Sequence, residues 1–218
     1  RHYLGSSYYP ALSSRLTQGK YLITSSTGAE QSLSSNAFDF MDGFYSGGQT
    51  DVVAWMWKRA PSFFDVVCYN GNSSVNTIDH NLGVAPEMMW IKARNSARNW
   101  FVYHTDVGIT KYVELDNTQA EQSFSTWANS TAPTATQFTV NTSFGNLNSS
   151  SYDYIAFLFT TLDGISKVGS YTGTGSTQTI NCGFSTSARF VLIKRTDSTG
   201  NWYVFDSERG ITTGSDPY

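Results

Sequence analysis

Histidine, cysteine and carboxylate side chains could carry chemistry in this sequence, but their spacing matches no catalytic or metal-binding pattern. The histidines are His2, His80 and His104, and the cysteines are Cys68 and Cys182. The sequence contains no HExxH motif, no paired CxxC motifs, no phosphate-binding loop and no GxSxG elbow. We therefore predict a protein that is not an enzyme, with no catalytic residues, no cofactor and no metal site.

An internal repeat supports this prediction. When the chain is aligned with itself at an offset of 102 residues, 15 of the 46 positions from 65 to 110 are identical. His80 then aligns with Cys182, and His104 aligns with Asp206. A ligand or base that served both copies would keep its chemistry, so we interpret both histidines as structural. The two cysteines are not equivalent in the repeat, and we expect them to be reduced and far apart.

A second match, at an offset of 91 residues, extends the repeat toward the N-terminus. Residues 20–22 align with residues 111–113, and residues 29–32 align with residues 120–123. The shorter offset makes residues 126–136 an insertion that the N-terminal segment lacks. We predict three segments: residues 1–36 are the tail of a preceding unit, residues 37–138 a complete unit, and residues 139–218 a second, truncated unit.

The elements of each copy are predicted to be β-strands. Short apolar segments alternate with Gly, Asn and Ser at intervals of roughly 8–12 residues, which is typical of β-sandwiches and barrels. We predict strands at residues 111–115, 154–159, 167–171, 177–182, 190–195 and 202–206. The predicted fold is all-β: tandem duplicated β-sandwich modules, jelly-roll-like, with a period of about 102 residues. Trp100 and Trp202 should be buried at equivalent places in the two modules.

Composition excludes several classes of protein. Aromatic residues make up 15% of the chain, charged residues make up 14%, and the net charge is −3. The chain is too aromatic to be disordered and too poor in Ala, Glu, Lys and Leu for a helical bundle. Because it lacks a basic run and an apolar window of ~18 residues, we expect no nucleic acid and no membrane as partner. Ser, Thr and Asn together number 68, which predicts a surface rich in hydroxyl and amide groups.

Trp127 is the candidate for ligand binding. It lies in the insertion beside Asn129, Ser130 and Thr131, and the N-terminal segment has no counterpart of it. An exposed indole among hydroxyl groups provides a surface on which a sugar ring can stack. We therefore predict Trp127 and Asn129 as candidate glycan contacts.

Two groups of sequence strings carry a resemblance to a known family. The first is HNLGVAPEMM at residues 80–89 with IK at 91–92 and WFVYH at 100–104, and the second is KVGSYTG at 167–173 with FVLIKR at 190–195 and NWYV at 201–204. Together they resemble a repeated domain of bacteriophage virion proteins, common in marine and cyanobacterial phages and associated with tail fibres and tail structure. The resemblance covers nearly all of the chain from about Phe38 onward. It implies location in the virion, and it carries no catalytic residues.

The resemblance leads to a functional prediction with two alternatives. We expect a non-enzymatic structural protein, a module of a tail fibre or appendage that attaches to host-surface glycans by multivalent contact. Its partners would be further copies of itself or other virion proteins. The first alternative is an assembly module that forms a shaft or filament by β-strand complementation and binds no ligand. The second is a polysaccharide-cleaving tailspike.

The ends of the chain are out of phase with the repeat. The strand type that follows residues 100–103 recurs near the N-terminus as Lys20, Tyr21, Leu22, Ile23 and Thr24. In the second copy, residues 202–205 have no such follower. Because an unpaired strand edge needs cover, we predict that these five residues fill the vacant strand position of the second copy, within the chain or from a neighbouring subunit. The alternative is that a longer parent chain completes both units.

Overall fold

The computed structural model of the chain describes residues 2–3, 10–32, 52–141 and 146–210. Apart from one 3-10 turn at Arg15–Thr17, every regular element in these residues is a β-strand, so the all-β prediction is confirmed. The strands are β1 (His2–Tyr3), β2 (Ala11–Leu12), β3 (Lys20–Ile23), β4 (Gln31–Ser32), β5 (Val52–Val53), β6 (Phe64–Asn70), β7 (Asn76–Asp79), β8 (Met88–Ala93), β9 (Phe101–His104), β10 (Lys111–Glu114), β11 (Gln122–Ser123), β12 (Gln137–Val140), β13 (Asp153–Phe159), β14 (Phe190–Lys194) and β15 (Trp202–Asp206).

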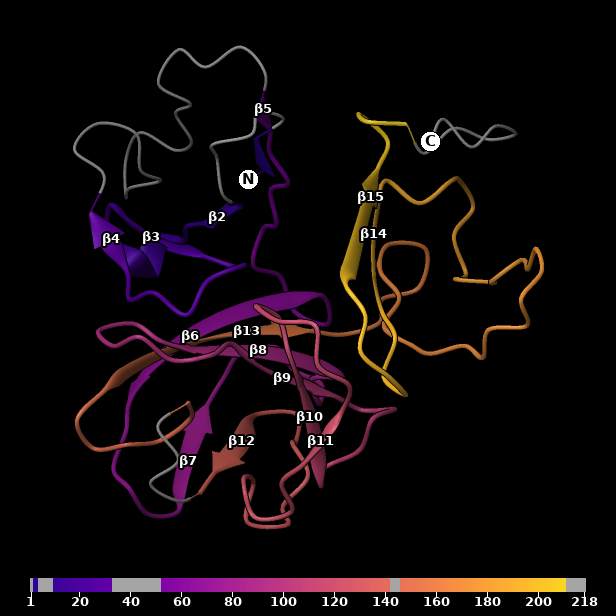
Figure 1. The fold of residues 1–218 in the computed structure, drawn as a ribbon. Helices are drawn as coiled ribbons and strands as arrows, with labels where there is room; N and C mark the ends of the chain where they lie inside the picture. Colours follow the sequence, from indigo (N-terminus) through magenta and orange to yellow (C-terminus); the bar gives the residue numbers. More distant parts are fainter. Residues whose placement is uncertain (1, 4–9, 33–51, 142–145, 211–218) are drawn as a thin grey trace.

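A six-stranded antiparallel sheet in the order β11-β10-β9-β8-β13-β6 forms the centre of the molecule (Figure 1). Strand β13 is inserted between β8 and β6, and its seven residues all pair with β6. It is apolar on both alternation phases, and residues 154–158 are all buried. A strand of this kind must be covered on both faces, because side chains alternate between the faces of a sheet.

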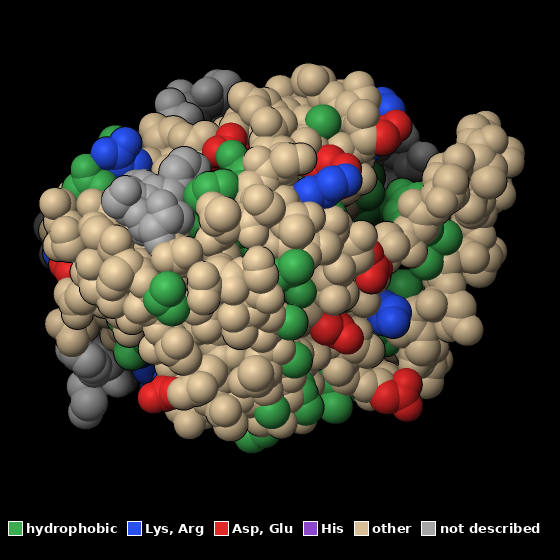
Figure 2. All heavy atoms as spheres, turned by 90° about the horizontal axis from the view of Figure 1, so that it is seen from below, with side chains coloured by type: hydrophobic (Ala, Val, Ile, Leu, Met, Phe, Trp, Pro, Cys, Tyr) green, Lys and Arg blue, Asp and Glu red, His purple; other side chains and the backbone are tan. Residues whose placement is uncertain are grey.

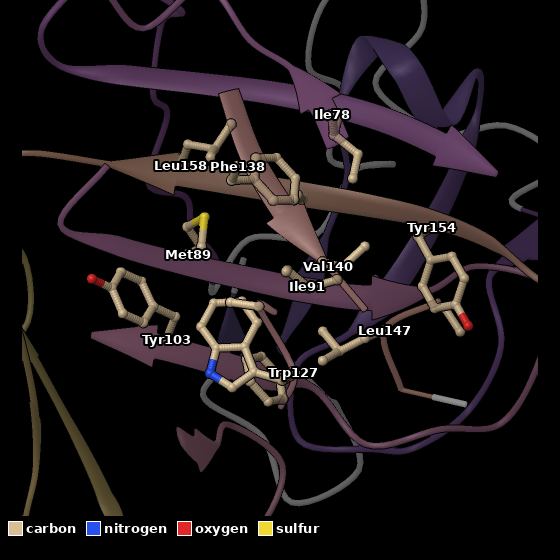
Figure 3. Packing of buried hydrophobic residues seen from close by; sticks show 14 of the residues in the cluster. Ile78, Met89, Ile91, Tyr103, Trp127, Phe138, Val140, Leu147, Tyr154 and Leu158 are labelled. Atoms are coloured by element: carbon tan, nitrogen blue, oxygen red, sulfur yellow. The ribbon is translucent and has the colours of Figure 1, made fainter. Parts of the chain in front are cut away.

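The lower face of this sheet is covered by a two-stranded sheet of β12 and β7 (Figure 1). Ile78 of β7 and Phe138 of β12 pack there against Met89, Tyr154 and the other residues of the main core (Figure 3). The main core is the set of buried residues Ile78, Leu82, Met89, Ile91, Ala93, Phe101, Tyr103, Trp127, Ala128, Phe138, Val140, Leu147, Tyr154, Ala156 and Leu158.

The upper face is covered by two pieces from opposite ends of the sequence (Figure 1). One is the three-stranded sheet β2-β3-β4, whose Leu22 is completely buried. The other is the hairpin β14–β15, which contributes Leu192 and Trp202 to the same apolar cluster. Full burial of a leucine such as Leu22 is worth about 1.5–3 kcal/mol. The N-terminal and C-terminal thirds therefore share one packing surface.

Strand registers recur at the offsets seen in the sequence. Met88 of β8 lies opposite His104 of β9, and Phe190 of β14 lies opposite Asp206 of β15. Both members of the second pair are 102 residues further along the chain than those of the first. The other pairs of β8–β9 recur in the same way. The pairing of β3 with β4 likewise matches that of β10 with β11 at an offset of 91 residues.

The predicted partner of residues 20–24 is wrong. Tyr21 pairs with Gln31 of β4, Leu22 pairs with Leu12 of β2, and the Thr24 amide donates to a backbone carbonyl just before β2. Both edges of β3 are thus occupied by its neighbours in sequence. Strand β2 takes the place beside β3 that β9 takes beside β10, so the position is not open to the second copy's sheet.

Two predicted strands of the second copy do not form: residues 167–171 and 177–182 are irregular. Their counterparts β6 and β7 are held by pairing with β13 and β12. In the described residues after 182, no strand occupies the place of either partner, and an unpaired strand is not stable in water. The boundary predicted between residues 138 and 139 also falls inside β12, and the central strand β13 lies on the second-copy side of it.

Candidate functional site

The side chain of Trp127 is buried, so its predicted role as a glycan platform is wrong. It is 0% exposed, and its ring centroid lies 5.1 Å from that of Phe101 and 5.5 Å from that of Tyr103. Figure 3 shows Trp127 beside Tyr103 in the core. The insertion folds back over the sheet, where the Trp127 carbonyl accepts a hydrogen bond from the Asn141 amide. Asn129, the other candidate, is exposed, but without the indole it offers no stacking surface.

The residues that could carry chemistry are dispersed. In the described part of the chain, no group of three or more His, Cys, Asp or Glu side chains is arranged to hold a metal ion. His80 is buried, and its Nδ1 accepts a hydrogen bond from the Leu82 amide at 3.2 Å. Burial lowers the pKa of His80, which favours the neutral ring. Cys68 and Cys182 are free thiols, in agreement with the prediction.

In the part of the chain that the structure describes, no helix has the length and apolarity needed to cross a bilayer.

Two contact regions repeat one another in detail, and they are the best candidates for a functional site. The first joint is the contact between residues 20–31, around β3 and β4, and residues 92–100, which run from the end of β8 to the start of β9. The second joint is the contact between residues 111–121, around β10, and residues 194–202, which run from the end of β14 to the start of β15. Each joint thus brings a hairpin connection against a strand of β3 or β10 type.

A tryptophan side chain makes the same hydrogen bond in each joint. In the first, Trp100 Nε1 donates to the Ile23 carbonyl at 2.9 Å. In the second, Trp202 Nε1 donates to the Glu114 carbonyl at 2.8 Å. The donors are 102 residues apart and the acceptors 91 residues apart, which are the two offsets of the sequence repeat.

A lysine ammonium group also recurs. Lys92 Nζ donates to the Thr27 carbonyl at 3.1 Å, and Lys194 Nζ donates to the Thr118 carbonyl at 3.1 Å. Lys92 Nζ donates in addition to the carbonyls of Ala93 and Ser96, so all three of its protons have acceptors. A completely buried ammonium group requires such partners, because an unpaired charge is very costly away from water.

Two backbone hydrogen bonds in each joint complete the correspondence between the joints. The Glu30 amide donates to the Arg94 carbonyl at 2.7 Å, and the Glu121 amide donates to the Thr196 carbonyl at 2.9 Å. The amides of residues 98 and 200 then donate to the carbonyls of residues 27 and 118. Because these bonds use the backbone, they do not depend on which side chains the two joints carry.

Side-chain charges distinguish the joints. In the first, Glu30 pairs with Lys20 at 2.8 Å and with Arg94 at 2.9 Å. In the second, Glu121 pairs with Lys111, and a threonine stands at the position that corresponds to Arg94. The first joint therefore has one more cation across its contact.

Burial changes the proton affinity of both lysines. It lowers the pKa of Lys92 to about 8, an effect that the Asp116 carboxylate opposes and the Arg98 guanidinium reinforces. Burial also lowers the pKa of Lys194, to which Arg195 contributes. At neutral pH Lys92 keeps its proton and its three hydrogen bonds. The ammonium group therefore fixes residues 27, 93 and 96 relative to one another.

Sequence reasoning found the tryptophans of the joints but missed the lysines. Trp100 is fully buried, as predicted, whereas Trp202 is only partly buried. Lys92 and Lys194 were also identical in the repeat; Lys92 is the penultimate residue of β8, and Lys194 is the last residue of β14. A charged residue retained near the end of an apolar strand was the signal that could have identified them.

Comparison with known proteins identifies the family of the chain and nothing nearer. Neither the search of curated proteins nor the search of solved structures returned a match. A family model does match residues 11–216, which span all three predicted segments and both joints. The chain accordingly belongs to the family DUF7483, described as a domain of unknown function.

Proposed function

We propose that this chain is a non-enzymatic structural protein of a phage virion, built from tandem copies of one β-sandwich unit and used in a tail fibre or appendage that attaches to the host surface. The repeated joint is the observation that carries the structural part of the proposal. The lysines and tryptophans shared by both joints make contacts between parts of the protein itself. In an enzyme, the residues retained in both copies would instead converge on a pocket.

The surface supports a role in contact with other macromolecules. On the face turned toward the viewer in Figure 2, charged side chains are few and scattered, and uncharged polar groups and backbone cover most of the area. Hydroxyl and amide groups suit hydrogen bonding to glycans, and repeated presentation raises the avidity of weak sites. The virion location rests on the resemblance described above.

The alternative, a module of assembly that binds no ligand, gains one specific argument. Trp127 lies in the core, which removes the indole that was proposed to stack on a sugar. Attachment and assembly therefore need separate tests.

The experiment uses phage particles whose genome encodes the chain. Gold-labelled antibodies raised against the purified protein should mark the tail appendages in electron micrographs, and particles without label would overturn the virion role. The purified chain, added in excess to host cells, should also reduce adsorption of the phage. Unchanged adsorption with labelled particles would instead favour the assembly role, and release of reducing sugar from host polysaccharide would refute the non-enzymatic one.

A further inference from the structure

The C-terminal hairpin exposes an apolar face that is buried in the complete unit. Tyr203 and Phe205 of β15 are 54% and 44% exposed, and their rings stack with centroids 6.4 Å apart. The corresponding residues of β9 are Phe101 and Tyr103, which are 0% and 5% exposed in the main core. Aromatic side chains at equivalent positions are thus buried in the complete unit and open to solvent in the C-terminal hairpin.

The other exposed apolar side chains follow the same rule. Met56 is 66% exposed, whereas its counterpart Leu158 is completely buried. Five of the seven large apolar side chains exposed in the described residues have counterparts in or against the main core; they are Met56, Tyr171, Ile180, Tyr203 and Phe205. Large apolar side chains that are left exposed side by side, as Tyr203 and Phe205 are, mark an interaction surface.

The complete unit shows what belongs on the free edge of β14. There, β13 pairs with the equivalent edge of β8, with Phe159 opposite Met88 and Leu158 opposite Met89. In the sequence repeat, residues 153–159 correspond to residues 51–57 near the N-terminus. The chain therefore contains a second segment of β13 type, and among its described residues Val52–Val53 alone is paired, with β1.

This segment already lies against β14. The ring of Trp55 meets that of Phe190 edge-on at 5.2 Å between centroids, and the ring of Trp57 does so at 5.3 Å. The Arg209 guanidinium, just after β15, lies 5.3 Å from the centroid of the Trp55 ring. Trp55 Nε1 is buried and has no hydrogen-bond partner among the described residues. Side-chain contacts thus hold residues 55–57 beside the hairpin without any backbone hydrogen bond between them.

We propose that residues 53–57 pair as an antiparallel strand with the free edge of β14, with Trp57 opposite Phe190 and Val53 opposite Lys194. The register is that of β13 on β8, moved by 102 residues at both strands. It places Met56 opposite Val191, on the face that carries Tyr203 and Phe205, because side chains two apart share a face.

The pairing makes one unit from the two ends of the chain. The N-terminal third supplies strands of β10, β11 and β13 type, and the C-terminal third supplies those of β8 and β9 type, while β2 keeps its place beside the β10-type strand β3. The two joints then become the two halves of one interface: the complete unit's Trp100 reaches Ile23 of the composite unit, and the composite unit's Trp202 reaches Glu114 of the complete unit. Such reciprocal contact is the mark of twofold symmetry.

A cross-link tests the register in the full-length chain. With Cys68 and Cys182 changed to serine, Ala54→Cys and Ile193→Cys place two thiols directly opposite each other. The matched control pairs Ala54→Cys with Val191→Cys, two residues away along β14. Under mild oxidation, the first pair should form an intramolecular disulfide about tenfold faster than the control, since bridging requires Cα atoms within ~7 Å. Equal rates, or a product of two chains, would overturn the proposal.

Hydrogen exchange on the unaltered chain provides a second measurement that does not depend on the variants. In a hairpin, alternate amides of β14 face β15, and the remaining ones face the free edge. If residues 53–57 pair there, both sets should be protected. Rapid exchange of the set on the free edge would refute the pairing, and this result would leave the virion role untouched because that role does not depend on it.

Discussion

The first and second joints share a backbone frame but differ in how deeply their polar side chains are buried. Lys92 and Trp100 are both 0% exposed, whereas Lys194 and Trp202 are partly exposed. The first joint also has the ion pair of Arg94 with Glu30. The comparison indicates that the repeated hydrogen bonds set the geometry, while the surrounding apolar cover determines how much each side chain contributes to stability.

Truncating the tryptophans should give the largest difference between the joints. Trp100→Ala is expected to lower the free energy of unfolding by about 3–5 kcal/mol, because it removes a fully buried indole and leaves a cavity. Trp202→Ala should cost about half as much, since part of its ring is already in water. Chemical denaturation of both variants, followed by tryptophan fluorescence and circular dichroism, measures the difference. Equal losses would show that the two joints are equally buried in solution.

Replacing the lysines should give the next largest effect. Lys92→Met keeps the aliphatic stem but removes the ammonium donor from the carbonyls of Ala93 and Ser96 and leaves the Thr27 carbonyl with a backbone amide as its donor. This loss should cost about 1–3 kcal/mol. Lys194→Met should cost less than about 1 kcal/mol, because water can reach the carbonyls that it leaves. The shift of the denaturation midpoint at pH 7 gives both values, and a larger loss for Lys194→Met would contradict the ranking.

The pH dependence of stability should separate the joints further. With its pKa lowered to about 8 by burial, Lys92 binds its proton less tightly in the folded chain than in the unfolded chain, where lysine titrates near 10.5. The free-energy cost of burying the charged Lys92 side chain is therefore complete below pH 8, and it is relieved as the pH rises through the interval between these values. Relative to Lys92→Met, the native chain should gain about 2 kcal/mol between about pH 8 and pH 10. A flat difference across this interval would show that Lys92 is solvated.

The acidic residues should give the smallest contrast. Glu30→Gln removes the partner of both Lys20 and Arg94 and should cost about 0.5–1 kcal/mol, because the carboxylate is mostly buried. Glu121→Gln removes a single ion pair, which is more exposed to solvent than those of Glu30, and should cost about 0–0.5 kcal/mol. Denaturation at low and high salt would check both values, and a larger, more salt-sensitive loss at Glu121 would reverse the ranking.

Much of the fold could be predicted from local pattern, and the failures occurred where an element depends on a distant partner. Strand β13 was recognisable because its apolar residues occupy both phases of the alternation. Residues 167–171 and 177–182 have the same pattern as β6 and β7, but a strand forms only where another strand completes its ladder. The pairing of β3 was mispredicted for a related reason, since β2 is too short to have a periodic signal of its own.

The candidate site was less predictable than the fold. Composition and insertion alone suggested an exposed Trp127, but the sequence does not show that residues 126–136 fold back over the sheet. The repeat did identify Trp100 and Trp202, because identity at equivalent positions reports a shared structural need. Lys92 and Lys194 carried the same information and went unused, since a lysine in a strand is ordinarily taken as exposed.

The place of β13 in the sequence has a consequence for the order of folding during synthesis. The strand joins β6 to β8 at the centre of the sheet, yet it is the last strand of that sheet to leave the ribosome. Until residue 159 has emerged, the facing edges of β6 and β8 remain unpaired, and the apolar residues of both are open to other nascent chains. Topologies of this kind fold slowly, because distant segments must meet before the ladder forms. We expect the chain to require dilute or chaperone-assisted conditions for high yield, and its refolding to slow sharply when β13 is weakened.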